Sequence, residues 1–163
     1  MADPNDNLVP KDARVQAAWA AFCRAHGVDE ATPYQAWYFG DSAELAHELI
    51  ELVVHGPKRG TANLKWAIDR NPDLAPIPNG YNLVTEHDGT PRAVLRTTDI
   101  EERPFDQVDE AFAWHEGEGD RSLAYWREAH WEYFGNLCAE LGLEPSLDMP
   151  VVLEKFELLW IAK

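Results

Sequence analysis

The chain has 163 residues and a formal net charge of −15, from 14 Lys and Arg residues against 29 Asp and Glu residues. Hydrophobic residues make up 45% of it and include seven Trp, six Phe and five Tyr, enough apolar material for the core of one domain. This composition excludes an intrinsically disordered chain. The acidity disfavours binding to long duplex DNA or to an anionic membrane surface.

The sequence carries no sign of export or membrane insertion. Its first residues lack a basic segment followed by an apolar one, and no stretch approaches the roughly 18–20 apolar residues of a membrane span. Its two cysteines, Cys23 and Cys138, are too few for a disulfide framework and are not spaced as metal ligands, which favours a reducing compartment. We therefore expect a cytoplasmic protein.

The first third of the chain predicts two helices after a flexible leader over residues 1–10. Apolar residues recur at helical spacing over residues 11–26, and Gly27 follows as a left-handed cap. A second helix is predicted to start at Asp41, which can form a capping box with Glu44, and to end at Gly56-Pro57. The aromatic run TPYQAWYFG between them is interpreted as core, with a base-stacking platform as the alternative.

The rest of the chain mixes strands and helices. Residues 62–70 are read as a short helix or a strand, residues 71–80 as irregular, and YNLVTEH and PRAVLRTTDI as a hairpin joined at Asp88-Gly89. Two helices follow, over 105–116 and 121–142, and then a final strand whose alternation places Val152, Glu154 and Phe156 on one face. The predicted fold class is α+β, with the strands in a small curved sheet or barrel, as a single domain over residues 11–163.

Charge is distributed unevenly along the chain. Residues 58–96 hold six basic side chains against four acidic ones, a local charge of +2, whereas the remainder carries −17. Because fields between exposed charges fade over a Debye length of about 8 Å, a local basic stripe on an acidic body can still bind a phosphate. The alternative is that these charges only block pairing at strand edges.

The string GPKRGT, residues 56–61, is one candidate for a functional loop. Gly60 permits close backbone approach, and Lys58 and Thr61 place an ammonium and a hydroxyl three residues apart, where they could face one ligand. Ordinary turn chemistry is the alternative. The order of residues differs from that of a P-loop, so a nucleoside-triphosphatase is not indicated.

A second candidate is HEGEGDRS, residues 115–122. Its spaced carboxylates Glu116, Glu118 and Asp120 could hold Mg²⁺ or supply a general base, or Asp120 could simply cap the next helix. On that helix, Arg127 and His130 fall within the apolar stripe and so need buried partners. We expect His130 to be hydrogen-bonded in the core and Arg127 to pair with an acid of the 116–120 loop.

Taken in order, these strings resemble the longer bacterial members of the ASCH (ASC-1 homology) domain family. The resemblance runs over about residues 37–160 and rests on YFGDSAELAHELIELVVHGPKRGT, HDGTPRAVLRTTDIEERPFDQV, AFAWHEGEGDRSLAYWREAHWEYF and DMPVVLEKFELL. It implies a PUA-like fold, a small β-barrel flanked by α-helices with a cleft between them. It also implies RNA-related work, because some members are Mg²⁺-dependent ribonucleases on single strands and small members deacetylate N4-acetylcytidine.

The resemblance also assigns residues. The family's GxKxxT-type motif falls on Gly56, Lys58 and Thr61, and the Glu that works with them in the amidohydrolases aligns with Glu118. A gap in that alignment leaves Glu116 and Asp120 as alternatives, and Ser122 is a candidate cleft contact. Relatives often carry Thr where this chain has Arg59, which leaves the substrate's identity open and favours a phosphate.

Three functions follow as hypotheses. In the leading one, a single-stranded RNA is hydrolysed: Lys58 and Arg59 hold a phosphate, Thr61 and Ser122 orient it, and Glu118 with Glu116 or Asp120 binds Mg²⁺ or acts as base, while Arg127 and His130 contact the substrate. In the second, Thr61 attacks the amide of N4-acetylcytidine after giving its proton to Lys58, without a metal. In the third, the domain binds RNA or a modified nucleoside without turnover. No organic cofactor is expected.

Overall fold

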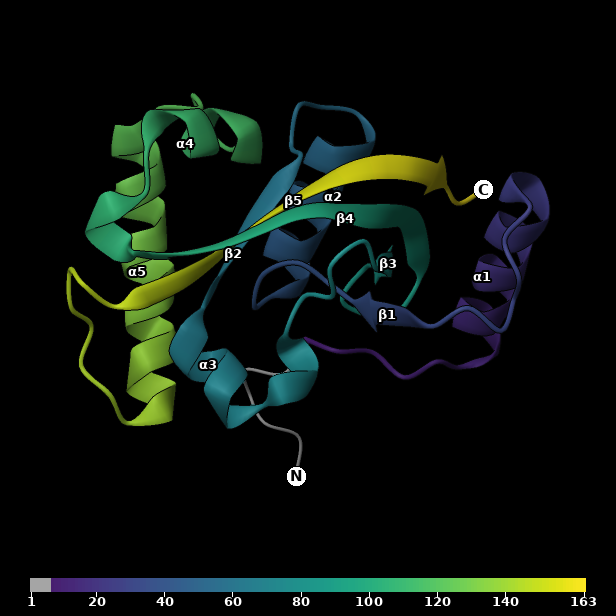
Figure 1. Cartoon of the computed structure of the whole chain (residues 1–163), viewed down its shortest axis with the longest axis horizontal. Coiled ribbons are helices and arrows are strands. Elements are labelled where there is room, and N and C mark those ends of the chain that lie inside the picture. The colour runs from purple at the N-terminus through teal and green to yellow at the C-terminus, as the bar shows by residue number, and fades with distance from the viewer. Residues whose placement is uncertain (1–6) are drawn as a thin grey trace.

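The computed structural model describes residues 7–163 and shows helices and strands around one mixed sheet (Figure 1). In chain order the elements are α1 (Ala13–His26), β1 (Tyr34–Trp37), α2 (Ala43–Val54), β2 (Gly60–Leu64), α3 (Lys65–Arg70), η1 (Pro72–Leu74), β3 (Tyr81–Thr85), β4 (Pro91–Pro104), η2 (Phe105–Gln107), α4 (Glu110–Glu116), α5 (Leu123–Leu141) and β5 (Pro150–Ile161). The predicted α+β class is confirmed.

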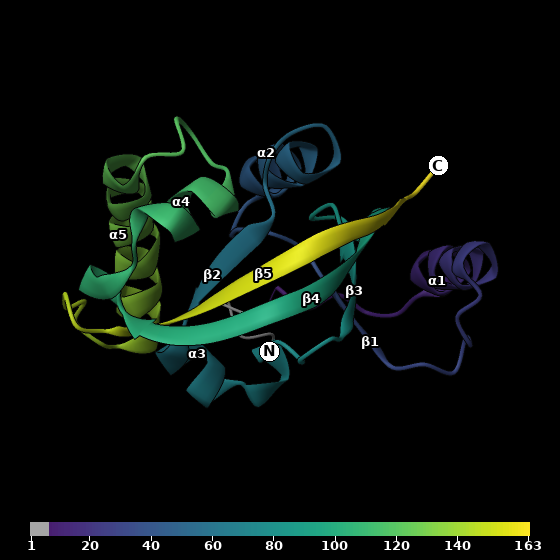
Figure 2. The ribbon, with the colours of Figure 1, turned by 45° about the horizontal axis from the view of Figure 1, so that its top comes forward.

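The sheet has five strands in the order β1-β3-β4-β5-β2, with β1 and β2 at its two edges. Among the strands of residues 7–163, only β1 and β3 run parallel; the other neighbours are antiparallel. β4 and β5 form a long ribbon through the middle of the molecule, and the sheet twists strongly along it (Figure 2). In the register of β2 and β5, Thr61 lies directly opposite Glu154.

Helices cover different parts of this sheet. α1 packs at the end where β1, β3 and β4 meet, and α2 lies over β3, β4 and β5. Along β4, Val94 belongs to the α1 cluster whereas Ala93 and Leu95 belong to the α2 cluster, so these helices contact opposite faces of one strand. α4 and α5 form a third cluster with the other ends of β2 and β5 (Figure 1).

Most predicted elements are confirmed, with shifts at their ends. The helix over 11–26 begins at Ala13 and ends at His26, and Gly27 caps it in the expected left-handed conformation with φ 65°. The 62–70 segment contains both alternatives, since β2 runs directly into α3. The hairpin at Asp88-Gly89 is confirmed by the pairing of β3 with β4, and β4 continues beyond the predicted end at Ile100 as far as Pro104.

Three local predictions need correction. α2 is capped by Ser42, whose hydroxyl accepts from the Leu45 amide, and not by Asp41. The helix predicted over 105–116 begins at Glu110, because η2 occupies its first residues. The irregular 71–80 segment contains the short helix η1, where Pro72 is tolerated in the first turn.

The predicted leader falls partly on residues 1–6, outside the described residues. Within the described part, the Val9 amide donates to the Ala36 carbonyl and the Tyr38 amide donates to the Asn7 carbonyl. Leu8 forms a β-bridge with Trp37, so residues 7–9 run along β1. Over residues 7–163, none of the helices has the length and apolarity that crossing a membrane requires.

Candidate functional site

A cavity of about 260 Å³ lies on one face of the sheet, between α2 and α5. Its walls include Trp37 of β1, Asn82 of β3, Thr61 of β2 and Glu154 of β5, so both edge strands reach it. The volume is just under the roughly 300–1,000 Å³ that is usual for small-molecule sites. A cavity of this size suits one nucleoside better than a run of nucleotides.

Lys58 enters this cavity from the turn that follows α2. Its amide donates to the Leu52 carbonyl, which anchors the turn to the end of the helix. The side chain is 1% exposed, and its ammonium donates to the Gly60 carbonyl at 2.7 Å. The same nitrogen lies 3.4 Å from a Glu118 oxygen and 3.6 Å from a Glu116 oxygen. A buried ammonium needs hydrogen-bond acceptors around it, and here the Gly60 carbonyl and the two glutamate side chains supply them.

The two glutamates reach Lys58 because the chain between them turns at Gly117. Gly117 has φ +78°, and a Cβ there would lie 2.7 Å from the Lys58 Cα. A side chain would therefore be strained by its φ and would collide with the Lys58 backbone. Glycine at this position lets the end of α4 approach the turn after α2.

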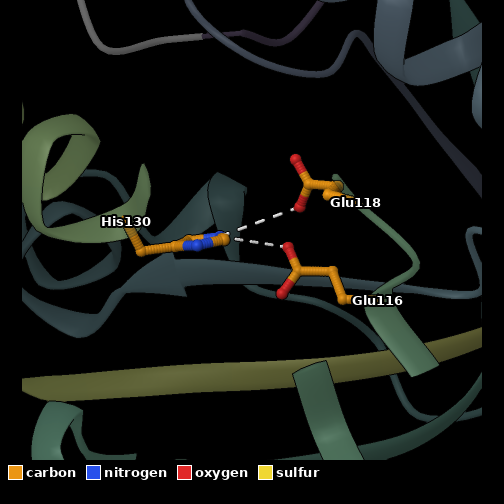
Figure 3. Close-up of side chains that lie close together, drawn as sticks. All are labelled: Glu116, Glu118 and His130. Carbon is orange, nitrogen blue, oxygen red and sulfur yellow. Dashed lines mark hydrogen bonds and ion pairs between the residues drawn. The ribbon is translucent and has the colours of Figure 1, made fainter. Parts of the chain in front are cut away.

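Glu116 is buried and forms the centre of a network with α5 (Figure 3). One of its oxygens accepts from the Trp126 indole, and the other lies 3.1 Å from Nε2 of His130. The Nδ1 of His130 lies 2.8 Å from the Trp126 carbonyl, which can only accept. Both ring nitrogens thus face acceptors, which suits a doubly protonated imidazolium.

These contacts set opposite protonation states on the two glutamates. Burial alone would raise the pKa of Glu116, but the positive charges of His130 and Lys58 outweigh it and hold that pKa well below the usual range. Burial raises the pKa of Glu118 to about 7; the negative Glu116 adds to this, and Lys58 opposes it. The pKa of His130 is raised, because its attraction to Glu116 exceeds the penalty of burial. Glu118 is the carboxyl group of this cluster that can exchange a proton near neutral pH.

The structure brings together part of the predicted site. Lys58, Thr61, Glu116, Glu118 and His130 all line the cavity. The expected hydrogen-bonded burial of His130 is confirmed.

Two of the predicted substrate-binding residues, Arg59 and Ser122, lie outside the cavity. The Arg59 guanidinium donates to the backbone carbonyls of Val53 and Lys58, where it closes the end of α2 instead of offering itself to a phosphate. The Ser122 hydroxyl caps α5 by accepting from the Tyr125 amide.

Asp120 and Arg127 also differ from expectation. Asp120 accepts from the Ser122 amide at 2.8 Å and is exposed, so it supports the capping residue without being the cap itself. Arg127 is exposed on α5 and has no hydrogen bond or ion pair with any residue of 7–163. The predicted pairing of Arg127 with the 116–120 loop is therefore wrong, because its side chain lies just outside the stripe that Trp126 and His130 occupy.

The cavity is acidic, contrary to what a phosphate site needs. The basic side chains of the 58–96 segment other than Lys58 do not line it, and Arg92 is paired with Glu51 and Glu86. Among residues 7–163, Lys58 is the only Lys or Arg on its walls and His130 the only His, whereas seven of the lining side chains are carboxylic: Asp41, Glu48, Asp73, Glu116, Glu118, Glu140 and Glu154. Their field would repel a polyanion.

The side chains that cluster in the cavity offer few of the ligands that Mg²⁺ requires. Of the two predicted ligands Glu116 and Asp120, only Glu116 belongs to a cluster, together with Glu118 and His130, whose ligand atoms lie within 4.8 Å of one another. Mg²⁺ prefers oxygen ligands and keeps several waters, whereas here an imidazole completes the set and the Lys58 ammonium already faces both carboxyl groups. This arrangement does not fit Mg²⁺.

Sequence reasoning missed the polar residues of the strands. Asn82 and Glu154 are buried and line the cavity, with Trp37 beside them. The alternation of the final strand contained a signal, because it placed Glu154 between the apolar Val152 and Phe156 on one face. A carboxyl group on an otherwise apolar strand face is a candidate for a buried functional group.

Comparisons with known proteins agree with this fold. The model of the ASCH domain family matches residues 35–160. The crystal structure of an ASCH domain from Lactobacillus crispatus JV V101 is 32% identical, with a TM-score of 0.84 over 93% of this chain and 96% of that one. The protein EF3133 from Enterococcus faecalis V583 is also 32% identical, with a TM-score of 0.81 over 91% of this chain and 89% of that one. None of the curated proteins compared with the chain matches it.

Proposed function

Because the chain belongs to the ASCH domain family, whose PUA-like fold generally binds RNA, we propose that its cavity takes one modified nucleoside and removes an acyl group from it by hydrolysis. The substrate class is a cytosine nucleoside acylated on its exocyclic nitrogen, with N4-acetylcytidine as the test compound. The observation that carries the proposal is the Glu118 carboxyl group, whose pKa of about 7 suits proton transfer, in a cavity that Thr61 also lines.

In the proposed reaction Thr61 is the nucleophile. Its hydroxyl oxygen bonds to the acyl carbon, and its proton passes to the Glu118 carboxylate. Glu118 then gives that proton to the amide nitrogen as the carbon–nitrogen bond breaks, which releases cytidine. A water attacks the resulting ester with Glu118 again as base, and acetate leaves as Thr61 regains its proton.

Lys58 has a positioning role in this scheme. Its ammonium donates to the Gly60 carbonyl and faces Glu116 and Glu118, so it is held as a donor and has no free lone pair with which to take the Thr61 proton. The base assigned to Lys58 from the sequence is therefore reassigned to Glu118. Lys58 fixes the Glu118 carboxyl group and offsets part of the charge that collects around it.

Cleavage of single-stranded RNA draws less support. The carboxyl groups around the cavity oppose several phosphates, Arg59 is engaged with backbone carbonyls, and the carboxylate cluster does not fit Mg²⁺. Labelled single-stranded RNA with Mg²⁺ therefore serves as the comparison substrate.

The test measures cytidine release from N4-acetylcytidine by chromatography, with Mg²⁺ and with EDTA. We expect turnover that EDTA does not change, a loss in kcat of about 10²-fold or more in Glu118→Gln, and an acetylated Thr61 peptide in the unmodified protein quenched with acid during turnover, measured by mass spectrometry. Glu128→Gln, a matched change on the exposed side of α5, leaves turnover unchanged. Absence of cytidine release by the unmodified protein between about pH 5 and 9 overturns the proposal.

A further inference from the structure

A second carboxyl group faces the same cavity from the sheet. Glu154 lies in the middle of β5, is 7% exposed and lines the cavity. Its cross-strand partner in β2 is Thr61. Side chains of such a pair lie on the same face with Cβ atoms about 4.5–5.5 Å apart. Glu154 therefore lies next to the proposed nucleophile.

A chain of hydrogen bonds through the sheet orients Glu154. The Trp37 indole donates to the Asn82 side-chain oxygen at 3.0 Å, and the Asn82 amide donates to the Thr97 hydroxyl at 3.0 Å. The Thr97 hydroxyl must then use its own proton, which it donates to Oε1 of Glu154 at 3.0 Å. Each group in this chain has a fixed direction, so Oε1 is defined as an acceptor.

The other oxygen of Glu154 has no partner. Within residues 7–163, Oε2 makes no hydrogen bond or ion pair, although the residue is more than nine-tenths buried. Oε2 is not one of the fully enclosed side-chain atoms that lack a partner, so it is accessible from the cavity, where a ligand atom or a water can pair with it. The free oxygen of a residue that lines the cavity is thus a place for a ligand atom.

No positive charge acts to lower the pKa of Glu154. Burial raises its pKa to about 7, and the hydrogen bond from Thr97 opposes this only in part. The charged groups of the neighbouring elements, namely Lys58 before β2, Glu116 and Glu118 beyond α4, and His130 on α5, do not contribute to this shift. In its protonated form Glu154 presents one donor, on Oε2, next to one acceptor.

We propose that Glu154 is the residue that recognises the base, binding a heterocycle that presents a ring nitrogen acceptor next to an N–H group. This inference deepens the proposed function. In a cytosine ring, Oε2 donates to N3 and the carboxyl group accepts from the N–H on the exocyclic nitrogen, which both the acylated substrate and the product retain. In this position the acyl group on that nitrogen lies near Thr61, the cross-strand partner of Glu154.

The test is cytidine binding by calorimetry, because it needs no turnover. Glu154→Gln keeps a donor next to an acceptor, and Thr97 forces the amide oxygen into the Oε1 position. We expect Glu154→Gln to bind cytidine within about threefold of the unmodified protein at pH 6, and Glu154→Leu to bind at least about tenfold more weakly. Glu157→Gln, an exposed change on the same strand, is the matched control.

A pH series separates recognition from a merely structural role. The affinity of the unmodified protein is expected to fall between about pH 6 and 8.5 as Glu154 loses its proton, whereas that of Glu154→Gln falls less. Equal pH profiles for these two proteins overturn the inference, even if Glu154→Leu does not fold. So does unweakened cytidine binding by a folded Glu154→Leu.

The two proposals can fail separately. Cytidine binding that depends on Glu154, without any release of acetate from N4-acetylcytidine, supports the inference and overturns the proposed function. Turnover of N4-acetylcytidine with an unchanged KM in Glu154→Leu supports the proposed function and overturns the inference.

Discussion

Two buried carboxyl groups of this cavity differ in their partners, and their charge states differ accordingly. Glu116 is surrounded by His130, Lys58 and the Trp126 indole, and its pKa is lowered although it is 2% exposed. Glu154 is similarly buried but meets only the hydroxyl of Thr97, and its pKa is raised to about 7. Burial alone therefore does not decide the charge of a carboxyl group; the groups that face it do. One end of the cavity is a compensated ionic cluster, and the strand face offers a carboxyl group that takes up a proton below about pH 7.

The largest expected effect comes from removing the cation of the cluster. Lys58→Met leaves Glu116 and Glu118 buried without their shared ammonium, and loss of one partner of a buried ion pair costs about 3–5 kcal/mol. We expect urea denaturation at pH 7 to show a fall of that size in the free energy of unfolding.

Two further variants sharpen this prediction. Adding Glu118→Gln to Lys58→Met is expected to recover part of the loss, because it removes one uncompensated charge. Lys155→Met, on β5 and outside the ion pairs of residues 7–163, is expected to change stability by less than about 1 kcal/mol. A Lys58→Met protein as stable as the unmodified one would contradict the ionic character of the cluster.

The next effect concerns Glu154 and the pH dependence of stability. Its pKa is about 7 in the folded state and near 4.5 when unfolded, so the folded state binds more protons between these values. Stability from this group is therefore full below about pH 4.5 and is lost as the pH rises through 7. The difference of about 2.5 in pKa corresponds to about 3 kcal/mol, at about 1.36 kcal/mol for each unit.

Glu154→Gln removes that titration. We expect its stability, measured by denaturation from about pH 4.5 to 8, to decline less steeply with pH than that of the unmodified protein. The slope should change in this variant and not in the exposed Glu157→Gln. Parallel curves for Glu154→Gln and the unmodified protein would show that Glu154 is ionised throughout.

A smaller effect on stability is expected for Glu118. At pH 6 a carboxyl group with a pKa of about 7 is mostly protonated, and Gln replaces it with almost the same shape and hydrogen-bonding pattern. Glu118→Gln is therefore expected to change the free energy of unfolding by less than about 1 kcal/mol at that pH, while it removes most of the deacylation. A large stability loss would indicate that Glu118 holds the cluster together as a carboxylate.

The elements of the fold were largely predictable from local pattern. Helix periodicity, Gly27 and the Asp88-Gly89 turn act through neighbouring residues, and α1 and the β3–β4 hairpin follow from them. The element ends were less predictable, because two polar residues close in sequence can each cap a helix: Ser42 and not Asp41 caps α2, and Ser122 and not Asp120 caps α5.

The site was predictable only where a motif carried it. Lys58, Thr61 and Glu118 do share a cavity, as the resemblance implied. Glu154 and Asn82 come from strands whose pairing spans many residues, so no local spacing connects them to Lys58. Arg59 is the opposite case. It lies beside the motif in the sequence, but its guanidinium donates to a backbone carbonyl and is therefore not free for a ligand.

The smallest expected effect is the change in melting temperature with Mg²⁺, which distinguishes a carboxylate cluster neutralised by lysine from one that binds a metal ion. A ligand that binds the folded state alone raises the melting temperature by an amount that grows with the ratio of its free concentration to its Kd. Since Lys58 already compensates Glu116 and Glu118, millimolar Mg²⁺ or EDTA is expected to shift the melting temperature by less than about 1 °C at low salt, measured by calorimetry. In Lys58→Met the two carboxyl groups lose that ammonium, so a stabilisation by Mg²⁺ that appears only in this variant would show that the lysine occupies the place of the cation. Stabilisation of the unmodified protein would instead favour the metal-dependent chemistry.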